Sequence, residues 1–250
     1  MASTLNHFGN AVRAIAPDHD FALLRQLQRR FRRQVKPRNR RDRMQEPRAL
    51  YGLGLKLMNQ AATIADPRAA AWIFRDGLLI AVATASGLRR KNLTSLAVGT
   101  NLHRVGDHYQ IVIEAQDMKT RRRLDQPLPT ALTPYIEEYL QTYRPRFPGA
   151  NRYAELWLSP KGGVLCKEAV WDAVRRHTLK AFGRPINLHL VRHTIATSAP
   201  DLGSPLLDHT KSTLTDQFYR HGDSIAASRK LAAVIATLRA AVPSSAIRPV

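Results

Sequence analysis

The sequence predicts a mainly helical protein with a small antiparallel β-sheet, that is, an α+β fold, in a chain of 250 residues. Two observations lead to this fold class. Over most of the chain, apolar residues recur at three- and four-residue spacing, which is the period of an amphipathic helix. From Val98 to Pro129 the pattern changes to short runs that alternate residue by residue, which is the period of a β-strand. No internal repeat is visible, so we expect helices around one inserted sheet.

The first predicted element is a pair of helices in residues 1–34, separated by Pro17. The apolar stripe of the second helix consists of Phe21, Leu24, Leu27 and Phe31. Residues 35–47 follow as a basic linker, in which Pro37 and Asn39 disfavour a continuous helix. A flexible basic segment is well suited to contact phosphates, so we expect it to bind a polyanion.

Two further helices open the longest predicted domain, residues 48–223. The stripe of the first consists of Leu50, Leu53, Leu57 and Ala61. Asp66 and Pro67 then form a helix start, because aspartate caps a helix and proline suits its first turn. The stripe of the second helix consists of Ala70, Ile73, Leu78 and Ala81. We expect this helix to end at Gly87, since glycine commonly follows the last helical residue.

The predicted sheet lies in the middle of this domain. Tyr109, Ile111 and Ile113 point to one face, and the residues between them point to the other. Gly106-Asp107 supplies the turn before them, and two or three antiparallel strands follow from this pattern. Leu156–Leu158 predicts one more short strand. Further helices are predicted at Thr133–Tyr143, at Lys167–Phe182, near Leu188, around Thr213 and at Ser224–Val242.

The composition favours a nucleic acid as partner. Lysine and arginine total 39 against 19 acidic residues, a net charge of +20, and such an excess indicates a polyanion partner. The longest uncharged apolar run, Gly77–Leu88, is shorter than the roughly 20 residues of a membrane-spanning helix. Residues 1–20 show no secretion signal, and the single cysteine, Cys166, can form neither an internal disulfide nor a metal cluster. We therefore expect a cytoplasmic protein with no membrane contact.

Six polar side chains have the chemistry to cut and rejoin a DNA strand without a metal. Two arginines can clamp a phosphate with paired, charge-assisted hydrogen bonds that strengthen in the transition state. A lysine and two histidines can donate hydrogen bonds and move protons, and a tyrosine can attack the phosphorus. The lysine lies where the predicted sheet turns, and one histidine and one arginine are three residues apart on a predicted helix. The six are Arg89, Lys119, His189, Arg192, His209 and Tyr219.

Four short segments around these residues resemble the tyrosine recombinases, also called phage integrases. They are Ala85–Arg90, His189–Thr197, Leu206–Thr210 and Tyr219–His221. The resemblance covers roughly residues 49–221, and its most specific feature is the ten-residue spacing from His209 to Tyr219.

The resemblance implies roles for these residues and an organisation for the chain. Tyr219 is the implied nucleophile that forms a 3′-phosphotyrosine bond, and the other five residues activate the phosphate, with no cofactor and no metal. Residues 1–34 are then a truncated, core-binding-like helical segment, residues 48–223 the catalytic domain, and residues 224–250 a C-terminal helix and tail. The implied partners are double-stranded DNA, further copies in a homotetramer on DNA, and accessory DNA-bending proteins. The expected DNA contacts are Arg33, Lys36, Arg38, Arg40, Arg41, Arg43, Arg90, Lys91 and Arg121.

The chain departs from the family pattern at three places, and these keep other functions open. Asn92 stands where the family usually has a glutamate, Asp208 replaces a common glycine, and the interval from Arg192 to His209 is short. One alternative is a catalytically impaired relic of an integrase that only binds DNA. Another is a topoisomerase-like enzyme that relaxes DNA with little sequence preference. A metal-dependent nuclease is disfavoured, because no carboxylate pair accompanies the six residues.

Overall fold

The computed structural model describes residues 2–34, 44–198 and Ala233, and every structural statement below concerns these residues. The chain divides into two compact units, Met1–Asp42 and Arg43–Val250. Each unit is described by itself. The predicted helices around Thr213 and at Ser224–Val242 lie outside the described residues, except that Ala233 is helical and exposed.

The first unit is a helical hairpin of α1 (Ala2–Ile15) and α2 (Ala22–Gln34), which confirms the predicted pair. The two helices are joined by a hydrogen bond from the Gln28 side-chain amide to the Leu5 carbonyl at 2.8 Å. The apolar face is only partly covered. The large apolar side chains that remain exposed are Phe8, Ile15, Leu23 and Leu27.

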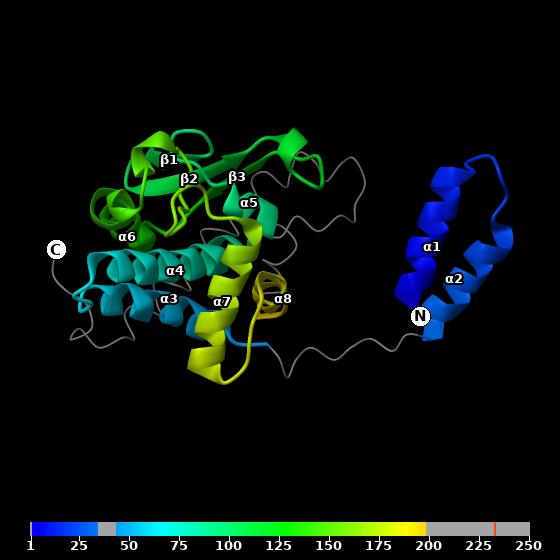
Figure 1. Ribbon diagram of the computed structural model, residues 1–250, viewed down its shortest axis with the longest axis horizontal. Coiled ribbons are helices and arrows are strands. Elements are labelled where there is room, and N and C mark those ends of the chain that lie inside the picture. Colours follow the sequence, from blue (N-terminus) through cyan, green and yellow to red (C-terminus); the bar gives the residue numbers. More distant parts are fainter. Residues whose placement is uncertain (1, 35–43, 199–232, 234–250) are drawn as a thin grey trace. The chain divides into compact units, whose positions relative to one another are not determined.

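The second unit is built on two long helices that run side by side, α3 (Pro47–Ala61) and α4 (Pro67–Ser86) (Figure 1). The backbones meet at Gly54 and Gly77, where a Cβ added to either residue would lie 2.7 Å from the carbonyl oxygen of the other. Since real Cβ atoms do not approach a carbonyl so closely, only glycine fits this crossing. The predicted start of α4 is confirmed, because the Asp66 side chain accepts a hydrogen bond from the Arg68 N–H at 3.0 Å.

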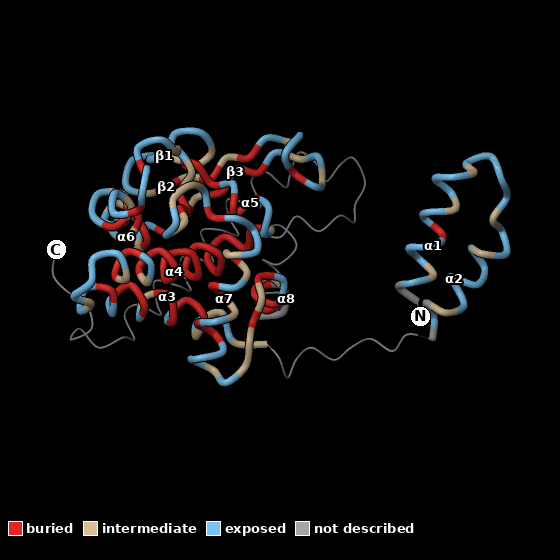
Figure 2. The backbone as a smooth tube through the Cα atoms, in the orientation of Figure 1, coloured by how far each residue is buried: buried red, intermediate tan, exposed pale blue. Residues whose placement is uncertain are grey.

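Helix α4 is the centre of the domain. It is buried along nearly its whole length in Figure 2, and every residue from Phe74 to Ser86 is buried. The uncharged run Gly77–Leu88 covers only part of this helix. The whole helix, Pro67–Ser86, is long and apolar enough to cross a membrane by length and composition alone. Its most apolar window is 83% buried inside the domain, and a central core helix has the same composition. The helix ends as predicted at Gly87, which has a left-handed φ of 60°.

The predicted sheet is a three-stranded antiparallel meander in the order β1-β2-β3. The strands are β1 (Leu102–Val105), β2 (His108–Ile113) and β3 (Leu124–Pro127). In β2 the alternation holds as predicted, with Tyr109, Ile111 and Ile113 buried and their neighbours half-buried. The connection between β2 and β3, residues 114–123, contains one 3₁₀ turn at Ala115–Asp117.

Four further helices are found among the described residues of this unit. They are α5 (Arg90–Thr94), α6 (Thr133–Glu138), α7 (Lys167–Phe182) and α8 (Leu188–Ser198). A π-helical turn, Tyr139–Tyr143, continues α6 through the predicted range, and 3₁₀ turns lie at Thr130–Leu132, Arg144–Arg146 and Ala150–Arg152. Helix α7 has the predicted bounds, and α8 begins at the predicted position. The fold class is therefore confirmed in the described part of the chain.

The predicted strand at Leu156–Leu158 is wrong. Only isolated bridges occur here, one from Leu158 to Val164 and one from Glu155, just before the segment, to Ala97. It is apolar because it crosses the core: Trp157 is fully buried and its indole N–H donates to the Leu93 carbonyl at 2.7 Å. A short apolar run alone does not distinguish a buried strand from a buried irregular segment.

Candidate active site

Arg89 lies at the junction between α4 and α5. The left-handed conformation of Gly87 turns the chain out of α4, and Arg89 is then the residue that precedes the first turn of α5. The Arg89 side chain is half-buried, while the adjacent Arg90 and Lys91 are exposed. The junction therefore carries three cationic side chains at the end of the most buried helix of the domain.

Helix α8 brings Arg192 to the same junction. The Arg192 guanidinium donates a hydrogen bond to the Gly87 carbonyl oxygen, across 105 positions of sequence. Burial of Val191 and Ile195 holds α8 against α3 and α4, and leaves Arg192 half-buried. His189 lies one turn earlier on α8 and is exposed.

Lys119 reaches this region on the connection between β2 and β3. That connection lies against α5: the Asn92 side-chain amide donates to the Met118 sulfur at 2.8 Å, and Lys91 is 3.9 Å from the Asp117 carboxylate. Strand β3 is joined to the same junction, because the buried Gln126 side chain donates to the Ser86 carbonyl at 3.2 Å. Lys119 itself is exposed.

Four of the six candidate residues thus come from three segments that meet around the α4–α5 junction. Arg89, Arg192 and His189 belong to the junction and α8, and Lys119 belongs to the loop docked on α5. His209 and Tyr219 lie outside the described residues. The described part of the candidate site is a partly solvent-accessible group of cationic and imidazole side chains, which has the chemistry of an anion site.

The residues expected to contact DNA fall into two groups. Arg33, in the first unit, and Arg90, Lys91 and Arg121, in the second, are exposed. Arg121 has a φ of 56°, which is rare for a residue with a side chain and marks a tight turn directly after Lys119 and Thr120. Lys36, Arg38, Arg40, Arg41 and Arg43 lie outside the described residues.

A second cluster of charged groups, which sequence reasoning missed, is buried in the core. Asp76 on α4 is fully buried and accepts hydrogen bonds from Arg75, from Arg176 at 2.8 Å and from the His177 ring at 2.9 Å. Arg75 also donates to the Leu158 carbonyl at 2.6 Å. Burial alone would raise the pKa of Asp76, but the His177 hydrogen bond and the Arg75 charge outweigh it, and the pKa lies below its ordinary value.

A sequence signal for this cluster exists. Arg75 and Asp76 are the only charged residues in the stretch 69–83 of α4, and a charge in such an apolar stretch must be paired when it is buried. The pair therefore indicates a buried ion pair, although it does not indicate Arg176 and His177 as further partners.

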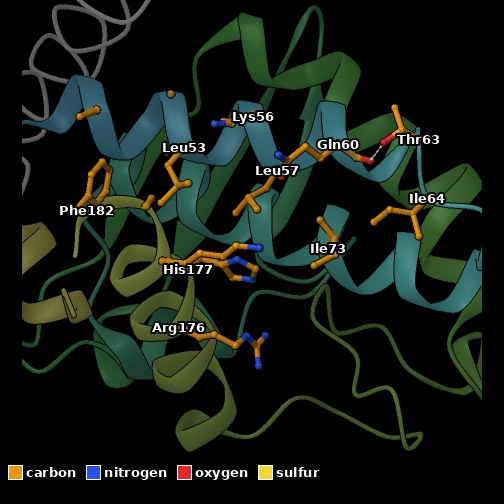
Figure 3. A pocket seen from close by; sticks show the side chains of 14 residues that line it. Leu53, Lys56, Leu57, Gln60, Thr63, Ile64, Ile73, Arg176, His177 and Phe182 are labelled. Carbon is orange, nitrogen blue, oxygen red and sulfur yellow. Dashed lines mark hydrogen bonds between the residues drawn. The ribbon is translucent and has the colours of Figure 1, made fainter. Parts of the chain in front are cut away.

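A groove of about 920 Å³ lies between α3, the start of α4 and α7. Figure 3 shows Leu53, Leu57 and Gln60 of α3 on one side and Arg176 and His177 of α7 on the other. None of the four described candidate residues lines it. Within the described residues, no three His, Cys, Asp or Glu side chains are grouped so that they could hold a metal ion.

Comparison with known proteins adds an independent finding. The model of the phage integrase family matches residues 55–224, a range that contains all six candidate residues. The chain is 29% identical over 159 residues to tyrosine recombinase XerD of Chlorobaculum tepidum. The matched region covers 61% of this chain and 50% of that protein. It is 25% identical over 156 residues to XerD of Staphylococcus saprophyticus. That matched region covers 56% of this chain and 52% of the relative. The chain spans about half the length of these relatives.

Two solved structures are also similar to this chain. One is the XerH site-specific recombinase bound to palindromic difH substrate in a post-cleavage complex, with a TM-score of 0.47 and 19% identity over 66% of this chain and 46% of that chain. The other is XerH bound to difH substrate in a pre-cleavage complex, with a TM-score of 0.46 and 19% identity over 66% of this chain and 47% of that chain.

Proposed function

The chain belongs to the phage integrase family, and on that premise we propose that it is a site-specific DNA recombinase that cuts and rejoins DNA through a 3′-phosphotyrosine intermediate. The observation that supports this proposal most directly is the hydrogen bond from Arg192 to the Gly87 carbonyl. It joins the helix that carries His189 and Arg192 to Gly87, which precedes Arg89 by two residues. The two segments are 105 positions apart in the sequence, so only the fold brings them together.

In the proposed reaction, Arg89 and Arg192 hold the non-bridging oxygens of one phosphate. Guanidinium groups present their donors in a rigid fork that matches these oxygens. Such contacts strengthen as charge gathers on the oxygens, so they lower the barrier rather than only binding the ground state. His189 and His209 complete the pocket as hydrogen-bond donors and proton acceptors.

Tyr219 is the proposed nucleophile. A phenol has an ordinary pKa of about 10 and is a weak nucleophile until a cationic pocket stabilises its phenolate. As the bond from the Tyr219 oxygen to phosphorus forms, the bond from phosphorus to the 5′ oxygen breaks and its electron pair leaves on that oxygen. The phenol proton passes to a histidine of the site, and Lys119 supplies the proton that neutralises the leaving oxygen.

The proposed substrate is double-stranded DNA in the bacterial cytoplasm, bound by several copies of the chain as a homotetramer. The exposed cations Arg90, Lys91 and Arg121 flank the candidate site, and we assign them to the DNA backbone. Arg33 and the linker cations Lys36, Arg38, Arg40, Arg41 and Arg43 would extend this contact. Phosphate contacts of this kind position the protein but do not read sequence.

The decisive experiment captures the covalent intermediate. The full chain is incubated with a pool of nicked duplexes that carry a randomised core, and adducts that survive denaturing detergent are recovered and sequenced. We expect adducts that share one sequence, and no adduct with Tyr219→Phe.

The alternatives predict different outcomes in the same experiment. Gel shifts of the pool without any adduct would support a chain that only binds DNA. Adducts without a shared sequence, together with relaxation of any supercoiled plasmid, would support a topoisomerase-like enzyme. Cleavage that a chelator abolishes would support a metal-dependent nuclease.

A further inference from the structure

The loop that carries Lys119 raises a problem of orientation. Lys119 is exposed, and among the described residues no hydrogen bond or ion pair holds its ammonium group. A long side chain on an exposed loop samples many positions, whereas proton transfer requires a donor within about 2.6–3.2 Å of the acceptor. The loop backbone must therefore be fixed if Lys119 is to deliver a proton.

The adjacent residue, Met118, provides such a fixed point. It is only 5% exposed and belongs to the main hydrophobic core, although its neighbours Asp117 and Lys119 are exposed. Its backbone is extended, and the chain turns directly after it, at Lys119 and Thr120. Burial of Met118 therefore fixes the backbone immediately before the exposed Lys119.

A tight turn fixes Lys119 further. The Arg121 N–H donates to the Met118 carbonyl at 3.1 Å, which closes a turn that has Lys119 and Thr120 at its centre. Met118 is thus both the core anchor of the loop and the first residue of the turn that presents Lys119.

Asn92 connects this anchor to the Arg89 segment. Its side chain is 4% exposed on α5, three residues after Arg89, and its amide donates to the Met118 sulfur at 2.8 Å. A glutamate at this position would place a carboxylate, which has no proton to donate, against the sulfur inside the core. The exposed pair of Lys91 and Asp117, at 3.9 Å, adds little because solvent screens it.

We propose that Asn92 and Met118 are positioning residues that hold the Lys119 loop on α5, so that Lys119 protonates the leaving 5′ oxygen of a phosphate bound at Arg89. This inference rests on the proposed function, because it assumes that Lys119 is the proton donor. It also explains the departure at Asn92, since an amide can donate to the thioether that anchors the loop.

The test compares two leaving groups in single-turnover cleavage by the full chain. The duplex is the sequence recovered by adduct capture, made once with the natural 5′ oxygen and once with sulfur at that bridging position. A thiolate leaves without protonation, since a thiol has a pKa of only about 8.5. Substitutions that disturb proton delivery should therefore harm cleavage of the oxygen substrate and spare cleavage of the sulfur substrate.

The reference variant is Lys119→Ala, for which we expect a loss of about 10²–10⁴-fold on oxygen, the usual contribution of a general acid. Met118→Ala and Asn92→Leu should each slow oxygen cleavage at least tenfold, and remain within threefold of wild type on sulfur. Met118→Leu keeps the buried apolar side chain but removes the sulfur to which the Asn92 amide donates, so it should slow oxygen cleavage about as much as Asn92→Leu and spare sulfur cleavage. Leu124→Ala is the matched control, because Leu124 is a buried residue of the same hairpin and does not adjoin Lys119.

The outcomes separate this inference from the proposed function. Equal losses on both substrates for Met118→Ala and Asn92→Leu, or no loss on either, would overturn the positioning role. If Met118→Ala does not fold, as judged by circular dichroism, Asn92→Leu and Met118→Leu decide in the same way. If the wild-type chain forms no adduct with any duplex, the proposed function itself fails, independently of Asn92 and Met118.

Discussion

The second unit, Arg43–Val250, contains two groups of arginine and histidine side chains that differ in their surroundings. Around Asp76 the group is closed: the carboxylate is fully buried and accepts hydrogen bonds from Arg75, Arg176 and His177. Around Gly87 the group is open: Arg192 is held by a backbone carbonyl, and His189 is exposed to solvent.

The difference shows how one residue type serves two purposes. The buried Asp76 carboxylate accepts from Arg75 on its own helix and from Arg176 and His177 on α7, so this cluster joins α4 to α7. A backbone carbonyl orients a guanidinium without adding a negative charge, so the contact of Arg192 with the Gly87 carbonyl does not itself neutralise the guanidinium. We therefore expect substitutions in the first cluster to change stability and substitutions in the second to change chemistry.

The largest expected effect is that of Asp76→Ala on stability. It leaves Arg75 buried without its counter-ion, and breaking one side of a buried ion pair costs about 3–5 kcal/mol of the free energy of unfolding. Urea denaturation followed by circular dichroism measures this cost. Asp172→Ala, which removes an exposed carboxylate of α7, should change stability by no more than about 0.5 kcal/mol. Equal costs for both variants would remove the distinction between the two groups.

Arg89→Ala and Arg192→Ala should have the next largest effect, and it should appear in the cleavage rate. Each removes a donor to the developing charge, so we expect single-turnover cleavage to fall by about 10²–10³-fold, or about 2.7–4 kcal/mol. Arg152→Ala, at an exposed position remote in sequence from the site, serves as control. Rates within tenfold of wild type for both site variants would contradict the assignment.

Acid should weaken the closed cluster through Asp76. Its pKa lies below the unfolded value of about 3.9, so its contribution to stability is complete well above pH 3.9. The contribution is lost as the pH falls from about 5 through the lowered pKa. Comparing wild type with Asp76→Asn by urea denaturation between pH 6 and pH 3 isolates this group. The stability difference should shrink toward low pH, and a constant difference would contradict the prediction.

The smallest effect per residue is expected in the basic linker. Replacing Arg38, Arg40 and Arg41 by glutamine should weaken binding to all DNA sequences and reduce the salt dependence by about 0.9 per lost phosphate contact. Fluorescence anisotropy at several salt concentrations gives the slope of log affinity against log salt. An unchanged slope would show that these three residues do not contact phosphate, whereas Arg152→Gln should leave the slope unchanged.

Much of the fold could be predicted because its signals are local. The stripe of α3 is buried at all four predicted positions, and the cap at Asp66 and the break at Gly87 lie where residue chemistry requires them. The stripe of α4 is less informative, because its second half is buried on every side. Ile73, predicted to be core, is half-buried and lines the groove.

The candidate site could be predicted only as a set of residues. Nothing local in the sequence indicates that Arg192 donates to the carbonyl of Gly87, or that Met118 rather than a polar loop residue anchors the Lys119 turn. Both contacts depend on how α8 and the hairpin pack on the end of α4. Sequence patterns report the period of an element, and they do not report the register in which two elements meet.

The crossing of α3 and α4 at Gly54 and Gly77 has a consequence for how this protein can evolve. From Gly77 to the end of α4 the helix extends about 15 Å, at 1.5 Å of rise per residue. A single methyl group added at the crossing would push the two helices apart there and tilt the rest of α4. A rotation of only about 4° there would shift the far end by about 1 Å, a misplacement that can cost catalysis about 100-fold. Replacement of either glycine by alanine would thus reduce the proposed DNA cleavage, although all six candidate residues would remain in the sequence.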